Sequence, residues 1–207
     1  MGSPPVQWLM DNFVADRRWC LIHCTHMTPD ETRRLAASGA VAGLCPTTEA
    51  NLGDGTFRAS DYLSNGGICG VGTDSNIQID AVAELRQLEY SQRLNYRSRN
   101  VLARREGEST GHRLYTAALS GGAQALSQSV GAIEPNRRAD IVILDADHPD
   151  LAAGPGHWLD SFLFVGGRRL IVSVIAGGEI VVESGRHRQH DGISAAYRRT
   201  IARLVGA

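Results

Sequence analysis

The sequence predicts an α/β fold in which a parallel βα array precedes a smaller β-rich unit. From residue 6 to about 127, short apolar runs alternate with helical patterns across short connections. After about residue 139 the apolar runs become β-rich, and Gly177-Gly178 joins two of them as a hairpin. An amphipathic helical pattern with arginines on its polar face closes the chain. These observations divide the chain into the βα array (1–130), the β strands (131–190) and a C-terminal helix (191–207).

The first part of the array reads as helix, strand, helix, strand. Residues 6–13 form the end of a helix, and the apolar run 19–23 predicts a strand. Thr28-Pro29-Asp30-Glu31 predicts a capping box with proline in the first turn, which opens a helix that stops at Gly39. Residues 41–45 predict the next strand, which Pro46 ends. A loop rich in glycine and aspartate is expected to follow.

A third strand and three helices complete the array. A short helix at about 60–65 stops at Gly66-Gly67, and residues 68–73 predict the strand. A long helix is expected from 81 to about 102, with Leu94 in its apolar stripe, followed by a helix over 110–126. The latter contains Gly121-Gly122, which predicts a close helix crossing. The β-rich runs 139–145, 169–175 and 179–182 follow.

Composition excludes several classes of protein. With 207 residues, 43% hydrophobic content and a net charge of −1, the chain can bury a substantial core. We expect no membrane segment, because no stretch approaches about 20 apolar residues, and a cytoplasmic location, because the start lacks signal-peptide features. We expect no nucleic-acid partner, because no aromatics interleave with the arginines. The absence of lysine excludes a Schiff base or a lysine ligand within the chain.

The four cysteines, Cys20, Cys24, Cys45 and Cys69, show no metal-binding spacing. Three of them lie inside apolar runs, so we interpret them as reduced, buried thiols. Cys24, beside His23 at a strand end, is the only candidate nucleophile.

His23 and Asp74 are the most informative side chains. Each closes an apolar strand-like run. In α/β folds, catalytic and binding residues lie at the carboxyl ends of parallel strands. If each residue is considered separately, we interpret His23 as a hydrogen-bonded histidine at the end of a strand and Asp74 as the cap of the next helix. Their joint placement favours a divalent metal, or a water that a metal activates. Three βα strands leave two open edges, so the array is either a short open sheet or part of a larger barrel.

Three segments resemble the sixth, seventh and eighth barrel strands of the amidohydrolase superfamily. They are the residues around His23, then Cys45-Pro46-Thr47-Thr48-Glu49, and then Gly70-Val71-Gly72-Thr73-Asp74. The resemblance implies the C-terminal portion of a (β/α)8 metal-dependent hydrolase barrel plus part of a small β-sandwich. Within the superfamily, Thr47-Thr48-Glu49, Gly53-Asp54-Gly55 and residues 84–94 resemble the formimidoylglutamate deiminases of histidine degradation. The likeness covers nearly the whole chain.

This resemblance implies hydrolysis of the C=N bond of a small-molecule substrate, N-formimino-L-glutamate, to N-formyl-L-glutamate and ammonia. Asp74 matches the aspartate that ligates zinc and takes a proton from water, and His23 matches the histidine that orients the attacking hydroxide. Iron is an alternative to zinc. The substrate-binding residues stay unassigned: Glu49 and Asn51 in the loop after the second strand either line the pocket or close a turn. We interpret His26 as structural, and Arg86 and Arg93 as structural ion-pairing residues.

The chain departs from the family pattern in one large respect. The His-x-His pair of the first strand, the fifth-strand histidine and its glutamate have no counterpart before residue 19, and His112, His148, His157, His187 and His190 fall outside strand ends. We therefore expect the isolated chain to bind no zinc tightly and to be inactive. The open edges predict a homo-oligomer, or complementation by an absent N-terminal half. The alternatives are a non-catalytic interaction module and another amidohydrolase deaminase.

Overall fold

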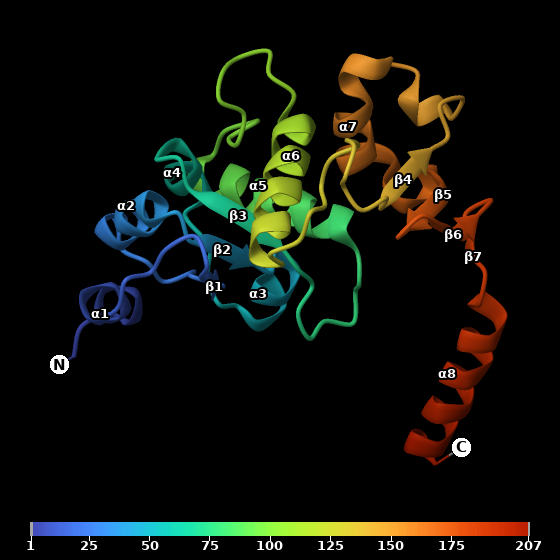
Figure 1. Cartoon of the computed structure of the whole chain (residues 1–207), viewed down its shortest axis with the longest axis horizontal. Helices are drawn as coiled ribbons and strands as arrows, with labels where there is room; N and C mark the ends of the chain where they lie inside the picture. Colours follow the sequence, from blue (N-terminus) through green and yellow to red (C-terminus); the bar gives the residue numbers. More distant parts are fainter. Residues whose placement is uncertain (1, 207) are drawn as a thin grey trace.

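The computed structural model describes residues 2–206 and contains two separate sheets. The first is parallel, in the order β1 (Cys20–Ile22), β2 (Val41–Leu44), β3 (Ile68–Val71). The second is antiparallel, in the order β4 (Ile141–Leu144), β5 (Ile171–Ala176), β6 (Glu179–Glu183), β7 (Arg186–His187). Figure 1 shows the first sheet among helices and the second beside it. The predicted α/β array followed by β strands is confirmed.

The helices around the parallel sheet lie close to their predicted positions. They are α1 (Pro5–Asn12), α2 (Pro29–Ser38), α3 (Pro46–Leu52), α4 (Ala59–Ser64), α5 (Ala81–Tyr96) and α6 (Thr110–Ala125). The predicted capping box is present: the Thr28 hydroxyl accepts from the Glu31 amide, and the Glu31 carboxylate accepts from the Thr28 amide. Gly39 ends α2 with φ +76°, a left-handed conformation that glycine adopts without strain.

Three predictions about this region were wrong. The segment after β2 is helix α3 instead of a loop, because Pro46 occupies the first helical position and Gly53 supplies a left-handed end. Helix α5 ends at Tyr96 instead of about residue 102, because Arg97 takes φ +51° and the chain turns back. Leu94 does not belong to the apolar stripe, since it is 81% exposed.

The parallel sheet is not buried throughout. Its core is formed mainly by β2, where Val41, Ala42 and Leu44 are fully buried. Strand β1 lies at an edge, and Ile22 is 55% exposed, so the expectation of a strand buried on both faces fails for β1. Trp19 precedes that edge and contacts Phe13, which contacts Trp8. All three rings are substantially exposed, so an aromatic surface adjoins the unpaired edge of β1.

Helix α6 packs directly on β3 at the predicted glycine pair, although the close contact is with a strand and not with another helix. A Cβ added at Gly121 would overlap the Cys69 carbonyl and lie 2.9 Å from the Gly70 nitrogen. A Cβ added at Gly122 would meet nothing within 4 Å. Only Gly121 is therefore required to be small.

The neighbouring glycines predict opposite effects on stability. Gly121→Ala should lower the free energy of unfolding by about 3 kcal/mol, because backbone atoms of β3 cannot yield to a methyl group. Gly122→Ala is the matched control and should raise it by about 0.5–1 kcal/mol, because alanine is the better helix former and the space is open. Urea denaturation of both variants measures the difference. Equal stabilities would show that α6 does not press on β3.

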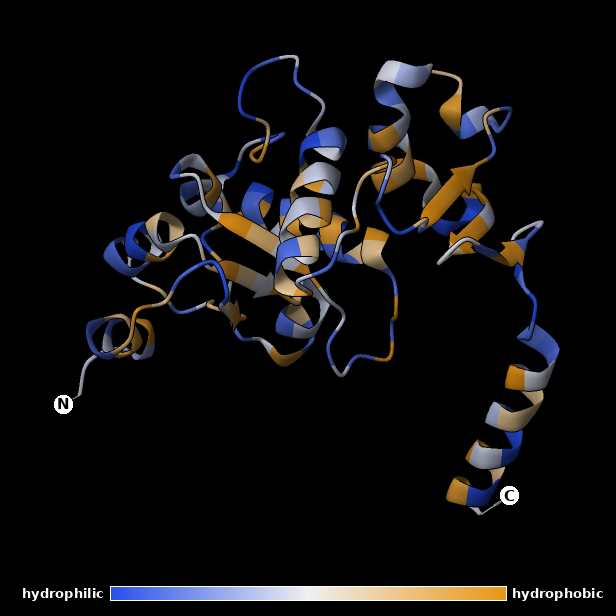
Figure 2. Ribbon diagram, viewed as in Figure 1, coloured by the Kyte–Doolittle hydropathy of each residue, from blue (hydrophilic) through white to orange (hydrophobic). Residues whose placement is uncertain are grey.

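The region after α6 is more irregular than predicted. Short turns of helix surround α7 (Trp158–Ser161), including a π-helical turn at Phe162–Gly166, and these segments connect β4 to β5. Gly177 and Gly178 form the predicted hairpin between β5 and β6. Helix α8 (His190–Val205) projects away from the rest of the chain with no buried residue, although it carries apolar side chains (Figures 1 and 2). Within residues 2–206, no helix is both long and apolar enough to cross a membrane.

Candidate functional site

The parallel sheet brings His23 and Asp74 together. The His23 amide donates to the Gly43 carbonyl at 2.8 Å, which makes His23 the last paired residue after β1, and Asp74 follows β3 by three residues. Both take left-handed backbone conformations, with φ of +67° and +51°. Such conformations are strained for residues other than glycine and cluster at functional sites. Here they turn the two side chains toward one another at the carboxyl edge of the sheet.

The two side chains face a shared space. His23 Nε2 lies 3.8 Å from Asp74 Oδ2, too far for a direct hydrogen bond and suited to an intervening group. The side chains are 37% and 41% exposed, so a ligand can reach both. Two donors bound to one zinc ion at about 2.0–2.2 Å lie no more than about 4.4 Å apart, so this spacing fits a shared cation.

Glu49 lies on the other side of the His23 ring. Its Oε1 is 3.3 Å from His23 Nδ1 and accepts the Cys45 backbone amide at 2.9 Å. Burial raises the pKa of the Glu49 carboxyl, while the bonds from Cys45 and His23 act against that shift. Asn51 lies near the other end of α3 and is exposed, so neither residue belongs to a loop as predicted.

A second possible donor cluster combines His23, Cys45 and Glu49, whose ligand atoms lie within 4.8 Å of one another. It does not fit a zinc ion. Burial raises the pKa of the Cys45 thiol to about 11, which opposes formation of the thiolate that zinc requires. The Glu49 oxygen is already engaged by an amide. The described residues therefore present two converging donors, His23 and Asp74, where a catalytic zinc takes three protein ligands.

The first turn of α3 links the ends of β1 and β3. Thr48 Oγ1 donates to the Thr73 carbonyl at 2.8 Å and accepts from Asn76 Nδ2 at 3.1 Å, which holds the backbone on both sides of Asp74. The Thr47 amide and hydroxyl both donate to Glu84, a fully buried carboxylate of α5. Sequence reasoning singled out Thr47-Thr48-Glu49 as a motif but missed the part that Thr48, Asn76 and Glu84 play.

The remaining candidates fall outside this arrangement. Burial raises the pKa of the Cys24 thiol to about 12, so it is no activated nucleophile. All four cysteines are free thiols; Cys45 and Cys69 are buried as predicted, whereas Cys20 and Cys24 are only half-buried, because they lie at the edge strand β1 and just after it. Arg93 makes the expected ion pair, with Glu89 at 2.7 Å, whereas Arg86 donates to the Leu163 carbonyl and makes no ion pair within the described chain. His26 makes no side-chain hydrogen bond among residues 2–206.

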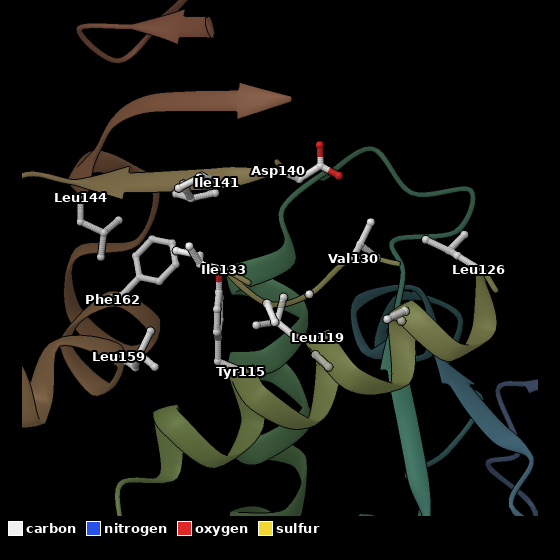
Figure 3. Close-up of a pocket in the computed structure, with 16 residues that line it drawn as sticks. Tyr115, Leu119, Leu126, Val130, Ile133, Asp140, Ile141, Leu144, Leu159 and Phe162 are labelled. Carbon is white, nitrogen blue, oxygen red and sulfur yellow. The ribbon is translucent and has the colours of Figure 1, made fainter. Parts of the chain in front are cut away.

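An apolar cavity of about 540 Å³ lies elsewhere, between α6, the segment 126–141 and β4 (Figure 3). Tyr115, Leu119, Ile133 and Phe162 project into it. Asp140, a charged residue, lies at the rim of the cavity and accepts a hydrogen bond from the Gly177 amide. None of the site residues lines it. This cavity is therefore separate from the candidate site.

Comparison with known proteins decides the family. The model of the amidohydrolase family matches residues 4–181. The chain belongs to the amidohydrolase family. This amidohydrolase is similar to formimidoylglutamate deiminase of Pseudomonas aeruginosa, with 47% identity over 99% of this chain and 45% of that protein. It is also similar to 5-methylthioadenosine/S-adenosylhomocysteine deaminase of Natronomonas pharaonis, with 29% identity over 92% of this chain and 43% of that protein.

Solved structures agree with this assignment. An amidohydrolase from Brucella melitensis matches with a TM-score of 0.90 and 44% identity, over 99% of this chain and 45% of that one. An adenosine deaminase from Xanthomonas campestris with bound zinc matches with a TM-score of 0.84 over 100% of this chain and 47% of that one; at 22% identity it supports the fold alone. The chain thus spans slightly under half the length of the relatives it matches. Its fold is a partial amidohydrolase fold.

Proposed function

We propose that this chain supplies part of the active site of a deiminase that hydrolyses the C=N bond of N-formimino-L-glutamate, giving N-formyl-L-glutamate and ammonia. The observation that carries the proposal is the 3.8 Å approach of His23 Nε2 to Asp74 Oδ2 at the end of a parallel sheet. The 47% identity to a formimidoylglutamate deiminase over 99% of the chain supports this substrate. Hydrolysis of C=N consumes one water and releases the nitrogen as ammonia.

Each residue has a distinct role in this proposal. Asp74 would help to hold a divalent metal and accept a proton from the attacking water, and His23 Nε2 would orient that water. Zinc, or iron, when bound, supplies Lewis acidity to this site. The exposed, facing nitrogen and oxygen support these roles. The proposal includes a cytoplasmic location, as the sequence led us to expect.

The proposal also assigns places in a larger fold. Strands β1, β2 and β3 correspond to the sixth, seventh and eighth barrel strands, and residues 131–190 contribute strands to the β-sandwich. Asp74 is the metal ligand in this proposal, and even with His23 the chain offers two donors where a catalytic zinc needs three protein ligands. The isolated chain is therefore inactive, and a complementary chain completes the site. The unpaired edge of β1 supports this view, because a barrel strand pairs on both sides.

Reconstitution tests the proposal. This chain would be co-expressed with the part of the Pseudomonas aeruginosa relative that lies outside the matched region, and ammonia release measured with zinc and N-formimino-L-glutamate. We expect turnover by the co-expressed pair and none by either part alone. Turnover of 5-methylthioadenosine instead would favour the second deaminase class, to which the 29% identity points. A well-formed complex with no turnover of either compound would favour a non-catalytic module.

The exposed edge and aromatic surface also predict self-association of the isolated chain. Ile22, Trp8, Phe13 and Trp19 are all at least 36% exposed, and an unpaired strand edge is a template for pairing. Light scattering should report dimers or larger species at micromolar concentrations. Co-expression with the complementary part should replace them with a 1:1 complex. A stable monomer of the isolated chain would contradict this prediction.

A further inference from the structure

We propose that Glu49 is a positioning residue that fixes the tautomer and orientation of the His23 imidazole. This inference rests on the proposed function, since it assigns a role toward the same site. Glu49 Oε1 lies 3.3 Å from His23 Nδ1, and the Glu49 side chain is 5% exposed. A carboxylate at Nδ1 keeps the proton on that nitrogen and leaves Nε2 with a free lone pair.

The Glu49 carboxylate is fixed independently of the histidine. The same Oε1 accepts the Cys45 amide at 2.9 Å, at the N-terminal end of α3, where backbone N–H groups and the helix dipole favour negative charge. The first turn of α3 is itself held by hydrogen bonds, because Thr47 donates to the buried Glu84 and Thr48 donates to the Thr73 carbonyl. The acceptor is therefore held by contacts that do not involve the His23 ring.

The consequence concerns the other ring nitrogen. With the proton on Nδ1, His23 Nε2 and Asp74 Oδ2 are both electron-pair donors, and they face one another at 3.8 Å. Two such donors do not bond to each other, so the space between them selects a cation or a water that donates to both. With the proton on Nε2, His23 would instead donate toward Asp74 and close this space. Glu49 thus keeps the pair open for a ligand.

Nuclear magnetic resonance of the full 207-residue chain with ¹⁵N-labelled histidine tests this role without substrate, metal or partner. Two-bond ¹H–¹⁵N couplings report which nitrogen of His23 carries the proton, at a pH where the ring is neutral. We expect the Nδ1–H form to predominate. Glu49→Gln should retain it, because the amide oxygen stays on the Cys45 N–H and still accepts from Nδ1. Glu49→Met keeps the length but removes the acceptor, and should shift the ring to a mixture rich in Nε2–H.

Glu84→Gln is the matched control, because Glu84 of α5 is another buried carboxylate that accepts from the first turn of α3 but does not touch His23. It should leave the tautomer unchanged. A wild-type ring that is mainly Nε2–H would overturn the role of Glu49 by itself, even if Glu49→Met does not fold. An unchanged Nδ1–H ring in folded Glu49→Met would also overturn it. If the tautomer behaves as expected but the reconstituted complex shows no turnover, the positioning role stands and the proposed reaction fails.

Discussion

Asp74→Asn is expected to reduce ammonia release by the reconstituted complex by about 10²–10⁴-fold, the contribution typical of a positioned acid or base. Asparagine keeps the size of the side chain but removes its negative charge and its capacity to accept the proton of the attacking water. The backbone at this position is already left-handed, with φ +51°, which asparagine tolerates as well as aspartate. The fold should therefore persist while the chemistry is lost. Initial rates at saturating substrate measure the effect.

The matched control is Asp147→Asn, which removes an exposed carboxylate in the turn after β4. Its rate should equal that of the unsubstituted complex. Circular dichroism and the yield of the complex check that both variants assemble. If the Asp74→Asn complex retains more than about a tenth of the rate, Asp74 does not take part in the reaction, because loss of a general base lowers the rate by more than about tenfold.

Glu89→Ala is expected to cause the largest loss of stability, about 3–5 kcal/mol. The Glu89 side chain is fully buried and accepts three bonds: from Arg93 Nε at 2.7 Å and from the Val101 and Leu102 amides at 3.0 Å. Alanine would leave Arg93 Nε and two backbone amides without their acceptor, although the Arg93 guanidinium keeps its bond to Asn100. It would also release the segment after α5 that Glu89 ties back onto the helix.

Urea denaturation provides the measurement, with Glu134→Ala as control. Glu134 pairs with Arg137 at 3.4 Å, and both side chains are largely exposed, so its loss should change stability by less than about 1 kcal/mol. A loss below about 1 kcal/mol for Glu89→Ala as well would mean that the loop satisfies its amides in another way.

The predictable parts of the fold are those that local sequence specifies. Thr28 and Glu31 form a capping box within four residues, and the Gly177-Gly178 pair forces a hairpin. The end of α5 was not predictable in this way, because Glu89 reaches 12 and 13 residues along the chain to hold the segment that follows. Helix α3 was missed because Pro46 was interpreted as a strand end, although proline also favours the first helical position.

The candidate site, like the fold, has some features that the sequence predicts and others that depend on contacts between distant residues. The approach of His23 and Asp74 follows from parallel topology, which aligns the carboxyl ends of β1 and β3 on either side of β2. The contact between Glu49 and His23 spans 26 residues and depends on how α3 begins, so no local pattern reveals it. The same holds for Thr48, which bonds to a carbonyl 25 residues away. Sequence thus identifies the residues at strand ends, and tertiary structure identifies those that position them.

The central claim is that His23 and Asp74 belong to one metal site that residues outside this chain complete. Zinc titration by calorimetry tests it most directly, on the isolated chain, the reconstituted complex and the complex with Asp74→Asn. The account predicts no tight binding by the isolated chain, one tightly bound zinc per reconstituted complex, and loss of that zinc with Asp74→Asn. Tight binding of one zinc by the isolated chain, or undiminished binding by the Asp74→Asn complex, would contradict it.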